Sequence, residues 1–474
     1  MLNTSWQKMS KSSFNIIVTL KLILLFITSH HFISLGETVG RLTMGLSVGV
    51  LFVIVFVSYL IRAKNLISLY SLYMVSVSAF LGGRFLASLF LDRNVFVTTY
   101  MVFTKASYEE VINLYNYLFL FVSSAHFAWM ICYSKVQQTV LPERHLNFEY
   151  HKCAQLLFTF AVLIIGFYFF SNRAVFLSGN YLSLYESQNS GGYSANYVVY
   201  GQMMLALAFG LIAPQKSAFK LVIVLFMLFV SFGFLFLGAR SFIVTTLLMI
   251  ILASNYSRLR FTGVSLKKLL LYSMLFIGVI YLAQFILVSR AGESIAGMEL
   301  SIGFILAQFF YMQGVSLMIF HLAIEIQDYP VLPIFASFIP SLGHFVSIFD
   351  PKMIYELSFS HFISHHYEKE LYAQGMGLGW TIMADLYYMS RGNVLVFFTL
   401  NFLFTSAFVL FENKSYKSTF GRAMLIAVSF KLMMLPRNTL SSVIPALYYQ
   451  LIILGGLLLL FITIKKACKV DRRK

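Results

Sequence analysis

Four arginines lie near the predicted ends of helices on one side of a membrane, far apart along the chain: Arg240, Arg290, Arg391 and Arg437. A guanidinium is always charged and can pair with two phosphate oxygens at once. Arginines that converge from several helices would therefore form a site for a pyrophosphate. Arg84 is a fifth candidate near the same side. Each arginine taken alone could instead anchor its helix among lipid headgroups.

The stretch 289–392 also holds groups that could accept a proton from a hydroxyl. His361, His365 and His366 lie close together, and histidine titrates near neutral pH. Asp385 lies between two glycine-rich turns. Glycosyl transfer to a hydroxyl needs such a base, and it needs cations that stabilise charge on the leaving group. Asp385, His361 and His365 are therefore candidate catalytic residues, each with the alternative of a solvated loop residue.

No sequence pattern indicates a metal ion, a cofactor or a nucleotide substrate. The acids expected on the outer side form no Asp-x-Asp pair, and the HFISHH sequence at 361–366 lacks the glutamate of a zincin motif. A glycine-rich nucleotide loop is also missing from the sequence. We therefore expect no metal, no cofactor and neither ATP nor a nucleotide sugar. A zinc site made by His361, His365 and His366 is the alternative.

The composition predicts an all-α polytopic membrane protein. Of its 474 residues, 59% are hydrophobic and 11% are charged, and the mean hydropathy is +0.80. Apolar runs long enough to cross a bilayer recur throughout residues 1–474, which we take as a single integral membrane domain. We expect about 12 transmembrane helices, within a range of 10 to 14. The predicted spans are 16–35, 44–61, 66–91, 114–133, 153–170, 196–213, 219–237, 241–254, 269–288, 393–411, 423–435 and 443–464.

The placement of lysine and arginine predicts the orientation. If the N-terminus is cytoplasmic, the inner segments hold most of the 35 lysines and arginines and few of the 18 acids. Both termini then face the cytoplasm, and the segments 171–196 and 289–392 form a first and a large outer loop. The net charge of +17 reflects this topology rather than nucleic-acid binding. The Ser, Asn, Gly and Tyr residues of 171–196 suit carbohydrate, but they are also ordinary loop residues.

Two further apolar stretches, 302–324 and 331–348, lie inside the large outer loop. The second contains two prolines and polar interruptions, so a re-entrant or surface segment is favoured over a straight span.

Three features resemble the Wzy-type O-antigen and oligosaccharide repeat-unit polymerases of bacterial inner membranes. They are LGARS at 237–241, the long outer loop before the last helices, and GLGWTIMADLYYMSRG at 377–392. Arg240 matches the arginine that opens its helix. Asp385 matches the acid at the end of the loop, although the usual acid there is glutamate. Arg290, Arg391 and Arg437 are assigned from topology, without a motif.

The resemblance implies a family-C-like glycosyltransferase architecture and transfer between two undecaprenyl-pyrophosphate-linked oligosaccharides. The growing chain would be the donor, bound by Arg240 and Arg290, and Asp385 or a loop histidine would position the acceptor hydroxyl. Membrane lipids and a regulator of chain length are the further partners expected, and nucleic acid is not.

Two other functions stay open. A glycan ligase would share the donor and the arginines, with an outer-loop histidine as its base. A lipid-linked oligosaccharide flippase would need charges through the whole membrane depth. Arg84 and Lys431 instead fall toward the outer half, and Lys21 falls toward the inner end.

Overall fold

The structure is a computed structural model. It describes residues 10–63, 67–91, 94–98, 102–133, 148–173, 196–213, 217–236, 240–257, 301–339, 342–349, 356–374, 376–415 and 417–471, with isolated helical positions at 271, 274, 278 and 281. For Arg240 and His344 only the backbone is described. Arg290 and most of the first outer loop therefore lie outside the described residues.

In the first half of the chain, the described elements are helices and one pair of short strands. Its elements are α2 (Lys11–Ile33), α3 (Glu37–Ala63), α4 (Leu69–Phe80), α5 (Gly83–Ala87), β1 (Val97–Thr98), β2 (Thr104–Lys105), α6 (Tyr108–Cys132), α7 (Phe148–Ser171), α10 (Asn196–Ile212), α11 (Ala218–Phe236) and α12 (Arg240–Ser257). Strands β1 and β2 pair antiparallel and lead into α6.

The second half contains short helices followed by three long ones. The short helices are α14 (Ile302–Gln313), α15 (Val315–Glu325), α16 (Leu332–Phe338), α17 (Leu342–Phe349), α18 (Phe359–Tyr367), α19 (Lys369–Ala373) and α20 (Ile382–Ser390). The long helices are α21 (Val394–Ser415), α22 (Thr419–Met434) and α23 (Ile444–Asp471), and the 3₁₀ turns η3 (Leu435–Arg437) and η4 (Leu440–Ser442) connect α22 to α23.

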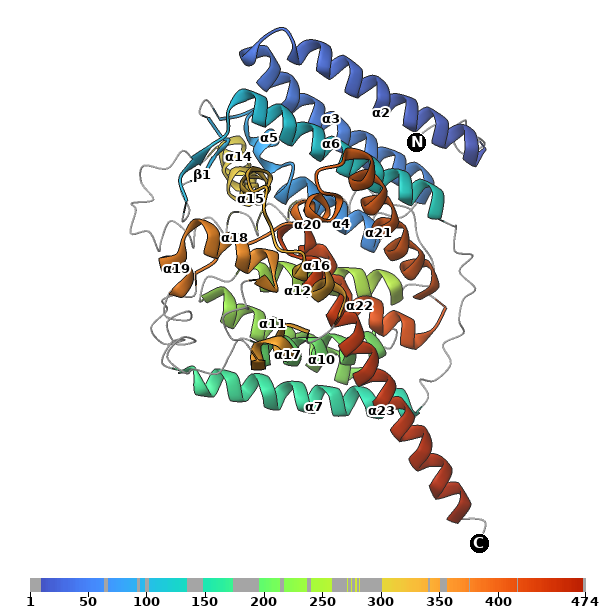
Figure 1. Cartoon of the computed structure of the whole chain (residues 1–474). Coiled ribbons are helices and arrows are strands. Elements are labelled where there is room, and N and C mark those ends of the chain that lie inside the picture. Colours follow the sequence, from blue (N-terminus) through green and yellow to red (C-terminus); the bar gives the residue numbers. More distant parts are fainter. Residues whose placement is uncertain are drawn as a thin grey trace.

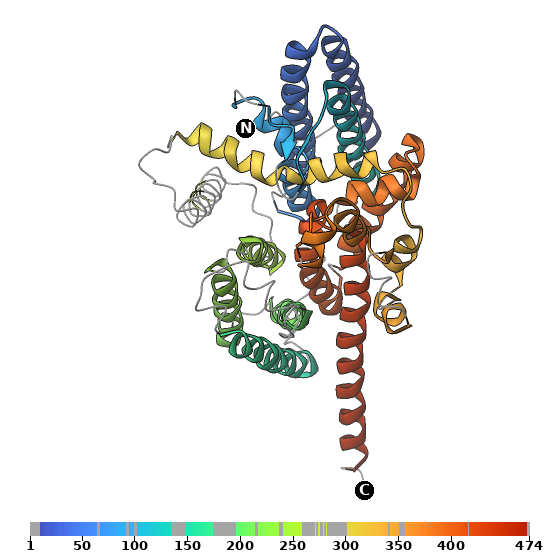
Figure 2. The ribbon, with the colours of Figure 1, turned by 60° about the vertical axis from the view of Figure 1, so that its left-hand side comes forward.

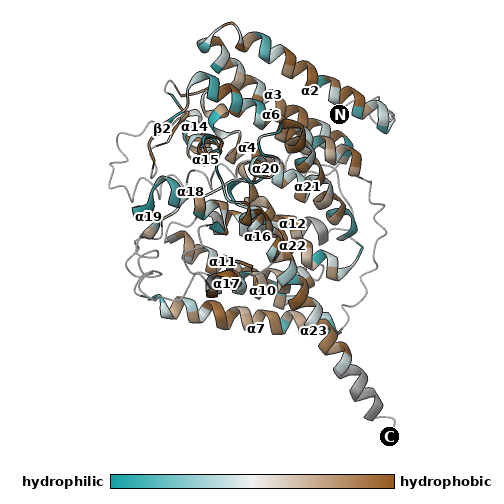
Figure 3. Ribbon diagram, viewed as in Figure 1, coloured by the Kyte–Doolittle hydropathy of each residue, from teal (hydrophilic) through white to brown (hydrophobic). Residues whose placement is uncertain are grey.

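Apolar side chains cover the outward faces of the long helices. On α7, Phe160, Leu163, Phe167 and Phe170 recur at helical spacing and are all exposed. Figure 3 shows hydrophobic colour along α7 and along the start of α23, whereas α19 is hydrophilic. Within the described residues, nine helices are long and apolar enough to cross a membrane. The chain is therefore an all-α, multi-pass membrane protein, as predicted.

Helices α2 and α6 run in opposite directions, so their ends meet at two ends of the bundle. At one end, Lys11 Nζ donates to the carbonyl of Ile131, which places the start of α2 beside the end of α6 (3.0 Å). At the other end, the Tyr108 hydroxyl donates to the carbonyl of Ile33 (2.8 Å). In Figure 1, α2, α3 and α6 lie together. We refer to the end with Tyr108 as the outer end, following the predicted orientation.

Every predicted span except 269–288 coincides with a helix, and that span is described only at isolated positions. The predicted span 66–91 is broken after Phe80, where Leu81 and Gly82 separate α4 from α5. The stretch 302–324 forms α14 and α15, and 331–348 forms α16 and α17. Figure 2 shows α14 and α15, in yellow, running across the direction of α2 and α3. By length and hydropathy alone, the stretch Gly303–Glu325, which includes most of α14 and all of α15, would count as another membrane-spanning helix.

Two glycines allow α14 and α15 to cross the N-terminal helices closely. A Cβ on Gly314 would meet the backbone nitrogen of Arg84 at 2.5 Å, and a Cβ on Gly83 would overlap the carbonyl oxygen of Phe310. Such distances are too short for any larger residue. The crossing therefore attaches α14 and α15 to the end of the bundle that holds α5.

Candidate functional site

Helix α20 carries Asp385 and ends at Arg391. The Thr381 hydroxyl caps its first turn by accepting from Met383 N (3.3 Å). Asp385 follows in the first turn, where a negative charge is favoured by the helix dipole. The side chain of Asp385 is fully buried.

Each oxygen of Asp385 accepts a hydrogen bond. Oδ1 accepts from the Trp380 indole (2.6 Å) and from the Thr439 hydroxyl (3.2 Å), and Oδ2 accepts from Leu440 N (2.7 Å). Burial raises the pKa of Asp385 to about 7, although the three hydrogen bonds lower it in part. In this conformation the carboxyl group joins α20 to the segment between η3 and η4. It presents no exposed oxygen to an acceptor hydroxyl.

Arg437 precedes that segment and is exposed. It ends the η3 turn, which begins at Leu435 immediately after α22 and contains Pro436. Its Nη1 donates to Gln313 Oε1 at the end of α14 (3.4 Å), and its guanidinium lies 5.9 Å from the centre of the Phe80 ring at the end of α4. The cation is therefore placed at the outer end by α4, α14 and α22 together.

Arg391 has an unusual backbone conformation. Its φ is 50°, and among the described residues no other non-glycine residue has a positive φ. It caps α20, with its N–H donated to the Tyr388 carbonyl (3.1 Å), and Gly392 follows with φ 72°. Glycine or asparagine is usual at such a cap, because a Cβ makes the left-handed conformation less favourable. The arginine side chain is exposed.

Three further contacts fix the position of Arg391. Tyr117 of α6 donates to the Gly392 carbonyl (3.0 Å). Tyr329 donates to the Tyr388 carbonyl (2.9 Å) and stacks on the Tyr388 ring, with ring centres 3.9 Å apart. Arg391 lies about 9 Å beyond Asp385 along α20, at 1.5 Å per residue. The exposed cation Arg391 therefore follows the end of α20, and the exposed cation Arg437 ends η3, just before the residues that donate to Asp385 of α20.

The other candidate arginines are placed differently. Arg84 is 3% exposed, its Nη1 donates to the carbonyls of Val95 and Val97, and its guanidinium lies 3.9 Å from the centre of the Tyr311 ring. These contacts join α5 to β1 and α14, so its geometry is that of a buried anchor. Arg240 opens α12, as the sequence predicted, but its side chain is not described. Arg290 lies outside the described residues.

His361 and His365 lie one turn apart on α18 and face the same tyrosine. His361 Nδ1 lies 3.1 Å from the Tyr372 hydroxyl of α19, and the His365 ring centre lies 5.6 Å from that of Tyr372. His366 instead contacts Phe362 and Tyr367. Among the described residues, no group of three metal-ligating side chains includes these histidines.

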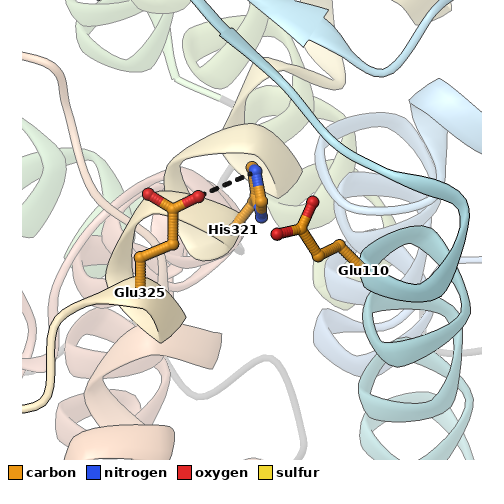
Figure 4. A group of neighbouring side chains, drawn as sticks. All are labelled: Glu110, His321 and Glu325. Carbon is orange, nitrogen blue, oxygen red and sulfur yellow. Dashed lines mark ion pairs between the residues drawn. The ribbon is translucent and has the colours of Figure 1, made fainter.

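A different group of possible ligands was missed by the sequence reasoning. Glu110 of α6 and His321 and Glu325 of α15 bring their ligand atoms within 4.8 Å of one another (Figure 4). The pattern His-x-x-x-Glu at 321–325 places both side chains on one helix face. No local pattern links this pair to Glu110, because only the crossing of α15 over α6 brings them together.

Comparison with known proteins identifies a family. The family model described as O-antigen polysaccharide polymerase Wzy matches residues 14–469. No curated protein and no solved structure matches the chain. The match includes every described candidate residue discussed above.

Proposed function

Since the chain belongs to the O-antigen polysaccharide polymerase Wzy family, we propose that it joins lipid-linked oligosaccharide repeat units by glycosyl transfer at the outer end of the bundle. The donor is the growing chain on polyprenyl pyrophosphate, and the acceptor is one new lipid-linked unit. The outer end faces the periplasm of a bacterial inner membrane, and both termini are cytoplasmic. A family-C-like glycosyltransferase architecture fits this reaction.

The transfer breaks one bond and forms one bond. A hydroxyl oxygen of the acceptor attacks the anomeric carbon of the donor, and the bond from that carbon to the pyrophosphate oxygen breaks. The hydroxyl proton passes to a base, and polyprenyl pyrophosphate leaves with the bonding electrons. Cations close to the pyrophosphate lower the energy of this step, because negative charge develops on the leaving oxygen. The transfer proposed here uses arginines for this purpose and requires no nucleotide and no metal.

Arg391 is the observation that carries the proposal. An exposed arginine on a left-handed backbone costs folding free energy, and such strain is characteristic of functional positions. Arg437 is a second exposed cation on an element fixed to the same helix through Asp385. We propose that both guanidiniums bind the donor pyrophosphate, together with Arg240 and Arg290. A regulator of chain length would act on the same protein as a partner.

The base is proposed to be a histidine of α18. His361 is exposed and has a hydrogen-bonding partner in Tyr372, whereas Asp385 is enclosed by its three donors. Asp385 is then a positioning residue, which holds the Arg437 segment against α20. The second candidate function is that of a ligase, which transfers finished polymer to a lipid core. The exposed His361 favours this function too, because a ligase is expected to use a histidine as its base.

One gel distinguishes these functions. Lipopolysaccharide from cells that lack the gene should show the core carrying a single repeat unit, because ligation would continue while chain growth is lost. Bare core alone would exclude the polymerase in favour of the ligase or the flippase. Complementation with Arg391→Ala should leave the single-repeat band, with the protein present in the membrane at the wild-type level.

A further inference from the structure

Glu110, His321 and Glu325 form a cluster outside the proposed pyrophosphate site. Figure 4 shows the three side chains directed toward one another, with Glu110 approaching from α6 and the other two from α15. His321 Nε2 lies 3.2 Å from Glu325 Oε1. His321 is 3% exposed, and both glutamates are exposed. The cluster therefore has a buried imidazole and an approach from solvent.

Neighbouring groups orient both carboxylates. The Tyr367 hydroxyl donates to Glu325 Oε2 (3.0 Å), and Ser107 N donates to Glu110 Oε2 (2.6 Å) as part of the capping box that begins α6. Each carboxylate thus has one oxygen held by a hydrogen bond, while the other oxygen can turn toward the imidazole. Hydrogen bonds to the second oxygen are what fix and tune metal-ligating carboxylates.

The donor set suits a divalent transition metal. Two carboxylates neutralise a divalent cation, and an imidazole nitrogen favours Zn²⁺ or Mn²⁺ over Ca²⁺ and Mg²⁺, which prefer oxygen ligands alone. Bonds of about 2.0–2.2 Å require the ligand atoms to approach more closely than the 4.8 Å that bounds them. Rotation of the two exposed glutamates supplies this movement.

We propose that Glu110, His321 and Glu325 bind one divalent transition-metal ion, with Zn²⁺ preferred, which fastens α15 to the start of α6. Both helices support the Arg391 cap. Tyr117, about 10 Å along α6 from Glu110 at 1.5 Å per residue, donates to the Gly392 carbonyl, and α15 packs against α20. The ion holds the outer loop in place and takes no part in the transfer itself. The proposal does not depend on the polymerase function.

Metal binding to the purified full-length protein tests the proposal. The protein, carrying an affinity tag without histidine, is stripped with a chelator in detergent and then titrated with Zn²⁺, Mn²⁺, Ca²⁺ or Mg²⁺. Bound metal and the unfolding temperature are both measured. We expect one equivalent of Zn²⁺ and a rise of the unfolding temperature of about 5 °C, with no rise in Ca²⁺ or Mg²⁺. An equal response to all four ions would overturn the proposal.

Conservative variants then locate the ion. Glu325→Gln keeps an acceptor for Tyr367, and Glu110→Gln keeps the capping box, since glutamine also serves at that position. Each should fold normally and weaken Zn²⁺ binding at least tenfold. Glu109→Gln, in the same helical turn but outside the cluster, should bind as the wild type does. Unchanged binding in both cluster variants, or loss of binding in a His361→Gln, His365→Gln double variant, would contradict the assignment.

Discussion

At the residue scale, Arg391 combines an exposed cation with an unfavourable backbone conformation. Replacing it by glycine removes both features. The free energy of unfolding should stay unchanged or rise by about 1 kcal/mol, because glycine adopts a positive φ without a steric penalty. Polymer synthesis should fall about 100-fold, because the transition state loses one hydrogen-bond donor to the leaving pyrophosphate. Thermal unfolding and the lipopolysaccharide ladder measure the two effects.

The controls separate charge from backbone. Arg391→Asn also suits the left-handed cap but carries no charge, so it should match the glycine variant in both measurements. Arg391→Lys keeps a charge and should retain part of the activity. A ladder of normal length from Arg391→Gly would exclude this side chain from the pyrophosphate site.

Asp385 offers a test of positioning against base catalysis. In Asp385→Asn, the amide nitrogen must face either the Leu440 N–H or the Trp380 indole, so one buried donor loses its acceptor. We expect a stability loss of about 1–3 kcal/mol and a partial loss of activity. Thr439→Ala, which removes one partner of Asp385 without changing the carboxyl group, should reduce activity similarly. A loss of activity confined to Asp385→Asn, of about 100-fold or more, would indicate a base.

The pH dependence of stability follows from the pKa of Asp385. Burial raises that pKa from 3.8 to about 7. Between these values the folded protein holds a proton that the unfolded chain has released, so the unfolding free energy decreases as the pH rises toward 7. The stability that the Asp385 proton adds to the folded protein is fully present below about pH 4 and is lost as the pH rises through 7. Unfolding at pH 5 and pH 8 should show a larger difference in the wild type than in Asp385→Asn. Equal differences would contradict the raised pKa.

At the element scale, the crossing of α5 by α14 and α15 sets the position of these two helices against the bundle. Gly83→Ala would place a Cβ against Phe310 O and 3.1 Å from the Cα of Gly314. Both neighbours are backbone, so the helices must separate, at a cost of about 1–3 kcal/mol. We expect lower thermal stability and less polymer, since α14 also supplies the partner of Arg437.

A matched control lies within α14. A Cβ added at Gly303 would have nothing within 4 Å of it, and alanine there should stabilise the helix by about 0.5–1 kcal/mol. If Gly83→Ala unfolded at the same temperature as Gly303→Ala, the close crossing would not contribute to stability.

The elements also show what the sequence could predict. The long helices followed from apolar runs and charge placement, because those signals are local. The break after Phe80 was missed, and so was the close approach of Gly83 to Gly314, because these two residues lie far apart in the sequence. Asp385 and Arg391 could be singled out as residues, but the partners of Asp385 come from 439 and 440, more than fifty positions away. Local patterns carry no information on such contacts, and the same is true of Glu110 with His321.

At the scale of the whole molecule, the bundle has a basic inner end. Arg62 Nη1 donates to Asn15 Oδ1 (2.5 Å), and Lys11 caps the end of α6. The last turn of α21 adds Lys414, and Lys417 lies between α21 and α22. Lysine and arginine are retained preferentially on the cytoplasmic side. This end should therefore be cytoplasmic, and the end with Arg391, Arg437 and the α18 histidines should be periplasmic.

Cysteine labelling tests this orientation with one residue at each end. Gln327, exposed between α15 and α16, and Lys417, exposed before α22, are each changed to cysteine in a chain without its three native cysteines. In cells with a permeabilised outer membrane, an impermeant maleimide should label Gln327→Cys at once. It should label Lys417→Cys only after the inner membrane is disrupted. The opposite pattern would place the arginines in the cytoplasm, where polyprenyl-linked donors that have already crossed the membrane could not reach them.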